Sequence, residues 1–370
     1  MGARAHERPR PRDHGLGLTR LPWRLAYLVL AVAALVTGVA GGLARLGVAP
    51  PTSAAAFHGA LMVSGFLGTV ISLERAVALG MRLAYAAPLA AGLGTLAMLA
   101  GYFEAGAALW IAAPLALFGA SVAIVFRQRE LHTVLLAVAP LAWLAGSILF
   151  LVHRADAAPA WWFAFLVITI AAERLEMTRL RPRRPSAAPL LVAAFALLGI
   201  GAAVAIVDAG TGRVIYGVAL CALALWLAIF DIARSTVRLA GFARYSAFAL
   251  LAGYVWLAAG GLAWAFAPHL RDLALHALGI GFVFSMILAH APLIVPVIAR
   301  IRMRYVPGFY VPLALLHLSL LLRVGFGPGD FMARAWGGSL NAAALVLFVA
   351  TLAYSIATRN SGTGASAGQS

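Results

Sequence analysis

Two histidines lie near the first turn of two membrane-length apolar stretches, His58 after Phe57 and His276 after Leu275. A histidine inside hydrocarbon is costly unless it has a partner, so by default it marks a functional site. Two of them at matching depth indicate a ligand held between helices, and a haem iron is the simplest such ligand. The alternative is that both imidazoles only hydrogen-bond a backbone carbonyl or interfacial water. The residues alone leave these two interpretations open.

Two further histidines form a second candidate site. His290 follows His276 by about four helical turns and therefore shares roughly its face, while His317 lies near the middle of the next apolar stretch. Together they indicate a second haem or a copper ion, or else a hydrogen-bonded polar pair. The sequence His290-Ala291-Pro292 also predicts a helix kink beside His290.

Carboxylates provide a weaker indication of a functional site. Glu74 lies beside Arg75, and Glu173 and Glu176 flank Arg174. These groups either feed protons into the bundle or form ordinary interfacial ion pairs. The chain has no Gly-rich phosphate loop, no His-Glu-x-x-His zinc motif and no nucleophile elbow. That weighs against a hydrolase and against an ATP-driven pump.

Composition identifies the class of protein. Of the 370 residues, 63% are hydrophobic and only 11% are charged, whereas soluble domains average about 25% charged residues. The mean hydropathy is +0.95. The single cysteine, Cys221, lies in an apolar stretch and excludes a disulfide framework or a thiolate metal cluster. The apolar runs lack the alternation of a barrel strand, so we expect an all-α integral membrane protein.

The hydropathy pattern predicts twelve spans within one domain, residues 23–358. We expect them at 24–44, 54–73, 83–102, 106–126, 132–152, 159–177, 187–207, 213–233, 245–266, 273–298, 308–327 and 337–357. An arginine- and proline-rich break at 178–185 separates two six-helix halves that are not separate domains. The basic segment 1–22 and the Ser/Gly-rich segment 359–370 are predicted to be disordered tails.

Arginine placement predicts the orientation. Only six of the 28 Lys and Arg residues fall in alternate connections, namely Arg45, Arg154, Arg213, Arg271, Arg323 and Arg334. The other 22 fall in the remaining connections and tails. By the positive-inside rule both termini are cytoplasmic, and we expect the inner membrane of a bacterium. The net charge of +16 then reflects topology and interaction with the lipid bilayer. We expect no nucleic-acid partner.

This orientation predicts that the first histidine pair lies in one layer. His58 and His276 each fall about four residues into a span that runs from outside to inside, roughly 6 Å below the outer boundary. Small residues follow both of them: Gly59, Ser64, Gly65 and Gly68 after the first, Gly279 and Gly281 after the second. Such residues leave room for a macrocycle, or they let helices pack closely in lipid.

The segments around this pair resemble a known family. His58-Gly59-Ala60-Leu61-Met62-Val63-Ser64-Gly65-Phe66 resembles the second helix of NnrS-type membrane proteins. Leu275-His276-Ala277-Leu278-Gly279-Ile280-Gly281, followed by Met286, resembles their late His-Ala-Leu helix. Those proteins are twelve-helix relatives of subunit I of the haem-copper oxidases. The resemblance implies a haem-copper-oxidase-like bundle, with a b-type haem ligated by His58 and His276.

The chain departs from that family in two places. Leu73-Glu74-Arg75-Ala76-Val77 stands where the family has Asn-Trp-Thr-Gly, and His290-Ala291-Pro292 stands where it tends to have Thr-Arg. In addition, the oxidases need histidines in helices six and seven for copper, and the spans 159–177 and 187–207 contain none. The sequence therefore excludes a terminal oxidase.

These observations predict a multi-pass haem protein that serves electron transfer or the sensing or detoxification of a diatomic gas such as nitric oxide. Its redox partner is not identified by the sequence. One alternative is a secondary transporter whose histidines and carboxylates bind a proton or solute, with Pro292, Pro296 or Pro312 interrupting its spans. The other is a non-catalytic membrane protein in which the histidines only pack.

Overall fold

The computed structural model describes residues 24–178 and 184–362, and every regular element in those ranges is helical. Twelve helices in this part of the chain are long and apolar enough to cross a membrane. The predictions of an all-α architecture and of a multi-pass membrane protein are thereby confirmed. A membrane favours this solution because a helix satisfies its backbone hydrogen bonds within one segment.

The first six spans comprise α1 (Arg24–Arg45), α2–η1–α3 (Ala54–Ala60, Leu61–Leu67, Gly68–Leu79), η2–α4 (Arg82–Tyr85, Ala86–Leu99), α5 (Phe103–Arg127), α6 (Leu131–Leu151) and α7 (Ala158–Met177). The last six comprise α8 (Ala187–Val204), α9 (Ala209–Phe230), α11 (Gly241–Phe266), η4–α12–η5–α13 (Pro268–Leu270, Arg271–His276, Ala277–Phe284, Ser285–Ala299), η6–α14 (Pro307–Phe309, Tyr310–Gly325) and α15 (Phe331–Gly362). The short helix α10 (Ala233–Thr236) lies in the connection after α9.

Most helix ends fall within a few residues of the predicted ones, and the clearest difference is at the last span. Helix α15 begins at Phe331 rather than at 337 and continues to Gly362, because the segment 331–336 is itself mainly apolar and the helix extends at its other end into polar residues. Residues 1–22 and 363–370 of the predicted tails, and 179–183 of the predicted break, lie outside the described residues.

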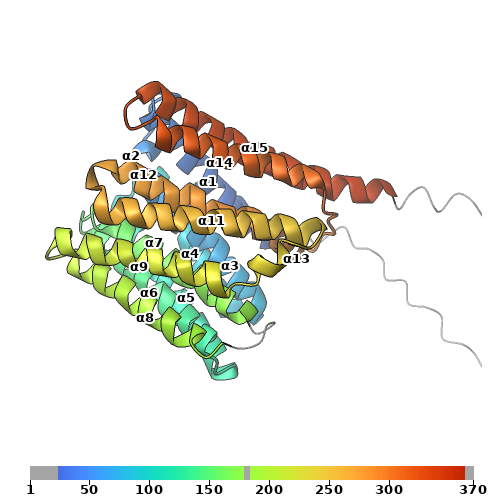
Figure 1. Ribbon diagram of the computed structural model, residues 1–370, viewed down its shortest axis with the longest axis horizontal. Coiled ribbons are helices and arrows are strands. Elements are labelled where there is room, and N and C mark those ends of the chain that lie inside the picture. The colour runs from blue at the N-terminus through green and yellow to red at the C-terminus, as the bar shows by residue number, and fades with distance from the viewer. Residues whose placement is uncertain (1–23, 179–183, 363–370) are drawn as a thin grey trace, which may run out of the picture.

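Neighbouring spans pack as antiparallel pairs, α4 with α5, α6 with α7, α8 with α9 and α14 with α15, and α11 packs against α9 and η5 (Figure 1). Small residues permit the closest approaches. A Cβ added to Gly201 of α8 would lie 2.5 Å from the backbone nitrogen of Tyr216 in α9. One added to Gly217 of α9 would lie 2.4 Å from the carbonyl oxygen of Gly261 in α11. Close backbone contact through glycine is the usual way in which helices associate in lipid.

The second and tenth spans share an irregularity. Each contains a π-helical segment, η1 (Leu61–Leu67) in the second and η5 (Ala277–Phe284) in the tenth, with α-helix on both sides. Such segments are rare in helices and are frequent at functional sites. In each span the π-helical segment begins within three residues after the histidine singled out above.

The bundle has two ends that differ in charge. At one end the connections carry clusters of arginines, such as Arg234, Arg238 and Arg244 after α9; we call it the arginine-rich end. Helices α2 and α12 lie at the opposite end, toward the left of Figure 1, while α3 and α13 extend toward the right. Since His58 and His276 belong to α2 and α12, both lie toward the opposite end.

Candidate functional site

The imidazole of His58 is oriented by the first span. Its Nδ1 lies 2.6 Å from the carbonyl oxygen of Gly38 in α1. One turn further along α1, a Cβ added to Gly42 would lie only 2.8 Å from the His58 Cε1 atom. Two glycines of α1 thus accommodate the ring and receive its hydrogen bond.

The imidazole of His276 is oriented by its own helix and by a carboxylate. Its Nδ1 lies 2.8 Å from the backbone oxygen of Asp272 and 3.3 Å from that residue's Oδ1. Asp272 in turn accepts two hydrogen bonds from Arg323 of α14, from Nη2 at 2.9 Å and from Nε at 3.1 Å. The Arg323 side chain is only 8% exposed, whereas that of Asp272 is 45% exposed. Hydrogen bonds thus connect His276 to Asp272 and Asp272 to Arg323, and this row fixes the orientation of the His276 imidazole.

These hydrogen bonds determine where each imidazole carries its proton. A carbonyl oxygen only accepts, so Nδ1 of His58 and of His276 must be the protonated nitrogen. The Nε2 lone pairs then remain, and neither Nε2 has a hydrogen-bond partner among the described residues. Histidines that ligate metals almost always donate their other ring N–H to a carbonyl or carboxylate. Both residues have that arrangement.

The structure brings His58 and His276 together. The two imidazoles are close enough to affect each other electrostatically, and His58 is also within electrostatic range of Asp272 and Arg323. Helices α2 and α12, which carry them, lie at the same end of the bundle (Figure 1). Residues more than two hundred positions apart in the sequence therefore share one region of the interior.

An aromatic pair joins the same two spans further along. Phe66 of η1 and Phe284 of η5 stack with their ring centroids 6.1 Å apart and their planes 20° apart. Each of them follows its histidine by eight residues. The second and tenth spans are therefore aligned in register, with the histidines at one level and the stacked rings at the next.

The small residues after each histidine divide into two groups. A Cβ on Gly68 would lie 2.4 Å from the Trp143 ring, and one on Gly281 would lie 2.4 Å from the Trp256 ring, so these glycines serve helix packing. A Cβ on Gly59, in contrast, would meet nothing within 4 Å, and one on Gly279 would meet only the Phe163 ring at 3.8 Å. Open space thus borders the glycines nearest the two histidines.

The second histidine pair has other partners. In α13, His290 Nδ1 donates to the carbonyl oxygen of Met286 at 2.6 Å, so its Nε2 accepts the hydrogen bond from Arg174 Nη2 at 2.8 Å. In α14, His317 Nδ1 accepts from Trp256 Nε1 at 3.0 Å. Both ring nitrogens of His290 are therefore engaged by the protein, and each histidine has a partner of its own.

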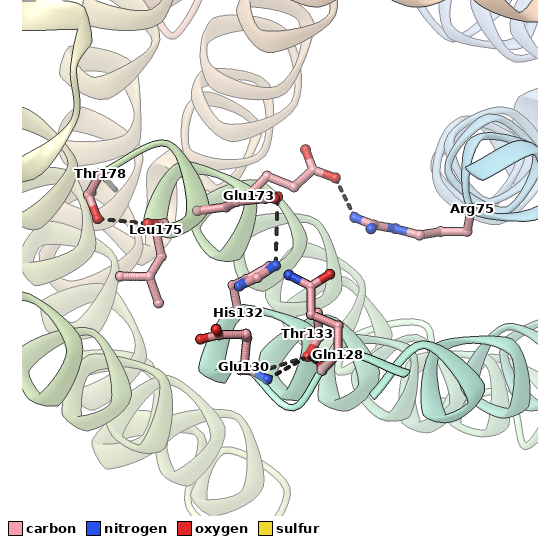
Figure 2. Close-up of polar contacts among 9 residues, drawn as sticks. Arg75, Gln128, Glu130, His132, Thr133, Glu173, Leu175 and Thr178 are labelled. Carbon is pink, nitrogen blue, oxygen red and sulfur yellow. Dashed lines mark hydrogen bonds and ion pairs between the residues drawn. The ribbon is translucent and has the colours of Figure 1, made fainter. Parts of the chain in front are cut away.

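The predicted proton-path carboxylates lie at the arginine-rich end. Glu173 of α7 accepts a hydrogen bond from Arg75 Nη2 of α3 at 2.6 Å, which Figure 2 shows bridging the two helices. Glu74 is within electrostatic range of both groups. At the start of α6, His132 Nε2 lies 3.8 Å from the Glu176 carboxylate. Glu173 thus joins α7 to α3 through its ion pair with Arg75, and Glu176 of α7 lies close to His132 of α6.

Comparison with known proteins identifies a family. The profile described as "Domain of unknown function (DUF8744)" matches residues 24–357, which is the whole helical bundle. The chain belongs to the DUF8744 family. No curated protein and no solved structure matches it.

The side chains of this DUF8744 protein that could bind a metal limit the type of metal centre that fits. No group of three or more His, Cys, Asp or Glu side chains able to hold a metal ion occurs among the described residues. A structural zinc ion takes four protein ligands and a catalytic one takes three. A haem supplies its own four nitrogens and needs one or two protein ligands. The free Nε2 atoms of His58 and His276 therefore fit a haem better than a bare metal ion.

Several residues of this DUF8744 site escaped sequence reasoning. Arg323 was counted only as a charge of an outer connection, and Asp272, Gly38 and Trp256 were not singled out. The spacing of four between Asp272 and His276 is the one signal that was readable, because residues four apart in a helix share a face. The contact with Arg323 needed the fold, since it joins the tenth span to the eleventh.

Proposed function

We propose that this chain is a haem-binding integral membrane protein in which His58 and His276 are the two axial ligands. The observation that carries the proposal is the matched register of the second and tenth spans. Each places an imidazole with a free Nε2 eight residues before one ring of the Phe66–Phe284 stack. Two unshared lone pairs in one apolar region are what a six-coordinate iron requires.

The residues around the pair have defined tasks in this proposal. Gly38 and Asp272 hold the Nδ1 protons, which keeps both Nε2 lone pairs directed away from those carbonyls. Arg323 holds Asp272 in place by its paired hydrogen bonds. Gly59 and Gly279 lack close neighbours other than the Phe163 ring. When bound, the haem would supply reversible one-electron transfer, or the binding of a diatomic gas such as nitric oxide if one imidazole is displaced.

The cysteine and histidine content of the chain supports one haem type and argues against one kind of centre. A haem attached covalently through Cys-x-x-Cys-His needs two cysteines, and this chain has one. We therefore propose a non-covalent, b-type haem. Helices α7 and α8 contain no histidine, which argues against the copper of an oxygen-reducing centre. We extend the proposal neither to a metal at His290, whose ring nitrogens already have partners, nor to a proton path through Glu173.

The wider relationships belong to the same proposal. The NnrS-like segments around His58 and His276 support a haem-copper-oxidase-like arrangement of the twelve helices. The arginine-rich end supports a cytoplasmic location of both termini in a bacterial inner membrane. A redox partner would then deliver or remove electrons at one membrane surface.

An optical spectrum tests the proposal directly. The full chain, purified in detergent from haem-replete cells, should show the Soret and α bands of a b-type haem on reduction, and a pyridine haemochrome assay should give the haem content. His58→Ala and His276→Ala should each lower that content at least tenfold. The matched control is His269→Ala, because His269 is an exposed histidine at the same end of the bundle.

Two further measurements keep the test decisive. Size-exclusion profiles and far-ultraviolet circular dichroism establish that each variant is folded. Free imidazole added to His58→Gly or His276→Gly should restore the spectrum by replacing the missing ligand. A colourless wild-type preparation, or variants that retain the wild-type spectrum, would contradict the proposal. The transporter interpretation would then be the one to examine.

A further inference from the structure

A basic pocket lies at the arginine-rich end, far from the histidine pair. It is an open cavity of about 170 Å³ between the start of α8 and the connection after α9. Its lining residues are Arg184, Ile229, Arg234, Ser235 and Arg238. Three of the five carry a positive charge and none carries a negative one. Its charge pattern is thus that of an anion site.

The three guanidinium groups are held by different means. The Arg184 guanidinium lies 6.0 Å from the Phe230 ring centroid, a cation–π distance. Arg234 Nη1 donates to the carbonyl oxygen of Ile229 at 3.3 Å, in the last turn of α9. The Arg238 backbone N–H donates to the carbonyl oxygen of Ser235 at 3.2 Å, while its guanidinium makes no hydrogen bond or ion pair with another described residue. Each guanidinium therefore keeps N–H donors available for an anion.

The acidic residue in this part of the sequence, Asp231, is directed toward the bundle interior. Asp231 is completely buried. Its Oδ1 accepts a hydrogen bond from the backbone nitrogen of Ala233 at 2.6 Å, and its Oδ2 lies 3.8 Å from Arg174 Nε in the bundle interior. Asp231 does not line the pocket, so its carboxylate does not occupy the position that an external anion would take.

We propose that this pocket binds a phosphate group, presented by an anionic phospholipid headgroup or as free phosphate. Guanidinium groups match phosphate oxygens with paired hydrogen bonds, and basic pockets between membrane helices bind phospholipid headgroups. The volume supports a small ligand: pockets for drug-sized molecules measure about 300–1,000 Å³, whereas a single water needs about 10–15 Å³.

Exposed leucines on α8 and α9, the two helices beside the pocket, favour a lipid over free phosphate as the source of the phosphate group. Leu190 of α8 is 52% exposed and Leu225 of α9 is 61% exposed. Exposed leucines on membrane helices face lipid tails. A phospholipid with its phosphate among the arginines would therefore lay its acyl chains against these two helices. Inorganic phosphate offers the same oxygens without that apolar contact.

Thermal unfolding of the full chain in detergent distinguishes the sources. Phosphatidylglycerol should raise the midpoint temperature more than phosphatidylcholine at equal mole fraction, and a parallel titration uses inorganic phosphate alone. In the double variant R234Q/R238Q the apparent affinity for phosphatidylglycerol should fall roughly twenty-five-fold, about fivefold for each arginine removed. The variant R238K, which keeps the charge, should retain most of the response.

The matched control is Arg302→Gln, which removes an exposed arginine from another connection at the same end and should leave the response unchanged. A response to phosphatidylglycerol alone, lost in the double variant, supports a lipid-borne phosphate. A response to inorganic phosphate, lost in the double variant, supports the site with a soluble ligand. Equal responses in the wild type and the double variant, or a response lost equally in Arg302→Gln, overturn the proposal.

Discussion

Phe66 and Phe284 stack with their ring centroids 6.1 Å apart, and this contact ties the second span to the tenth one level beyond the histidines. Aromatic pairs add about 0.5–1.5 kcal/mol beyond the burial of their area. A double-mutant cycle with Phe66→Leu and Phe284→Leu should return a coupling free energy in that range, measured by thermal unfolding in detergent. A coupling near zero would show that the two spans are not in this register.

The pair between Asp272 and Arg323 should respond unequally to loss of each partner. Asp272→Asn leaves the buried Arg323 guanidinium without its carboxylate, while Arg323→Gln leaves a carboxylate that is 45% exposed to solvent. Because an unpaired buried charge is the costlier of the two, we expect Asp272→Asn to lower the free energy of unfolding by about 2–4 kcal/mol. We expect the loss in Arg323→Gln to be about half as large.

A control pair exists at the same end of the bundle. Arg154 and Asp156 form an ion pair whose side chains are 44% and 62% exposed. Exposed pairs contribute about 0–1 kcal/mol, so Asp156→Asn should leave the unfolding midpoint almost unchanged. If Asp272→Asn proved equally harmless, the role given to the carboxylate in fixing His276 would be refuted.

The glycines near the histidines should separate into two classes on substitution. Gly68→Ala and Gly281→Ala force a Cβ to within 2.4 Å of an indole ring, and such overpacking costs about 1–3 kcal/mol. Gly59→Ala meets nothing within 4 Å and should be tolerated. Unfolding midpoints and expression yields measure the difference. The reverse order of effects would mean that Gly59, and not Gly68 or Gly281, is closely packed.

His290 should behave as a structural acceptor. His290→Gln keeps an oxygen for the Arg174 guanidinium, whereas His290→Ala removes it, so the alanine variant should be less stable by about 1.5–3 kcal/mol, the value of a hydrogen bond to a charged group. Haem content should be unchanged in both variants under the proposed function. A loss of haem or copper in His290→Gln would instead assign this residue to a metal.

The number and limits of the spans followed from the sequence because each depends on local hydropathy. Even α15, whose start moved from 337 to Phe331, kept its apolar centre. His58 and His276 stood out for the same local reason, as costly groups in apolar stretches. The pairing of these two residues rested on arginine counting and on a resemblance, and the structure supplies their separate hydrogen-bond partners.

Contacts between distant spans were beyond sequence reasoning. The Asp272–Arg323 pair joins two spans, and the Trp256–His317 bond joins α11 to α14. Neither leaves a periodic signal in one segment. The glycines illustrate the same limit: Gly59 and Gly68 are both small residues of one span, and only the positions of Trp143 and its neighbours show that one of them serves packing and the other does not.

The π-helical segments also set the angular phase of their spans. An α-helix turns about 100° per residue, and a π-helix accommodates one more residue in each turn. Deleting one residue from η1 or η5 would favour the α-helical period and change the direction of the histidine relative to the Phe66–Phe284 stack. The direction in which each imidazole points therefore depends on the number of residues in the π-helical segment of its span.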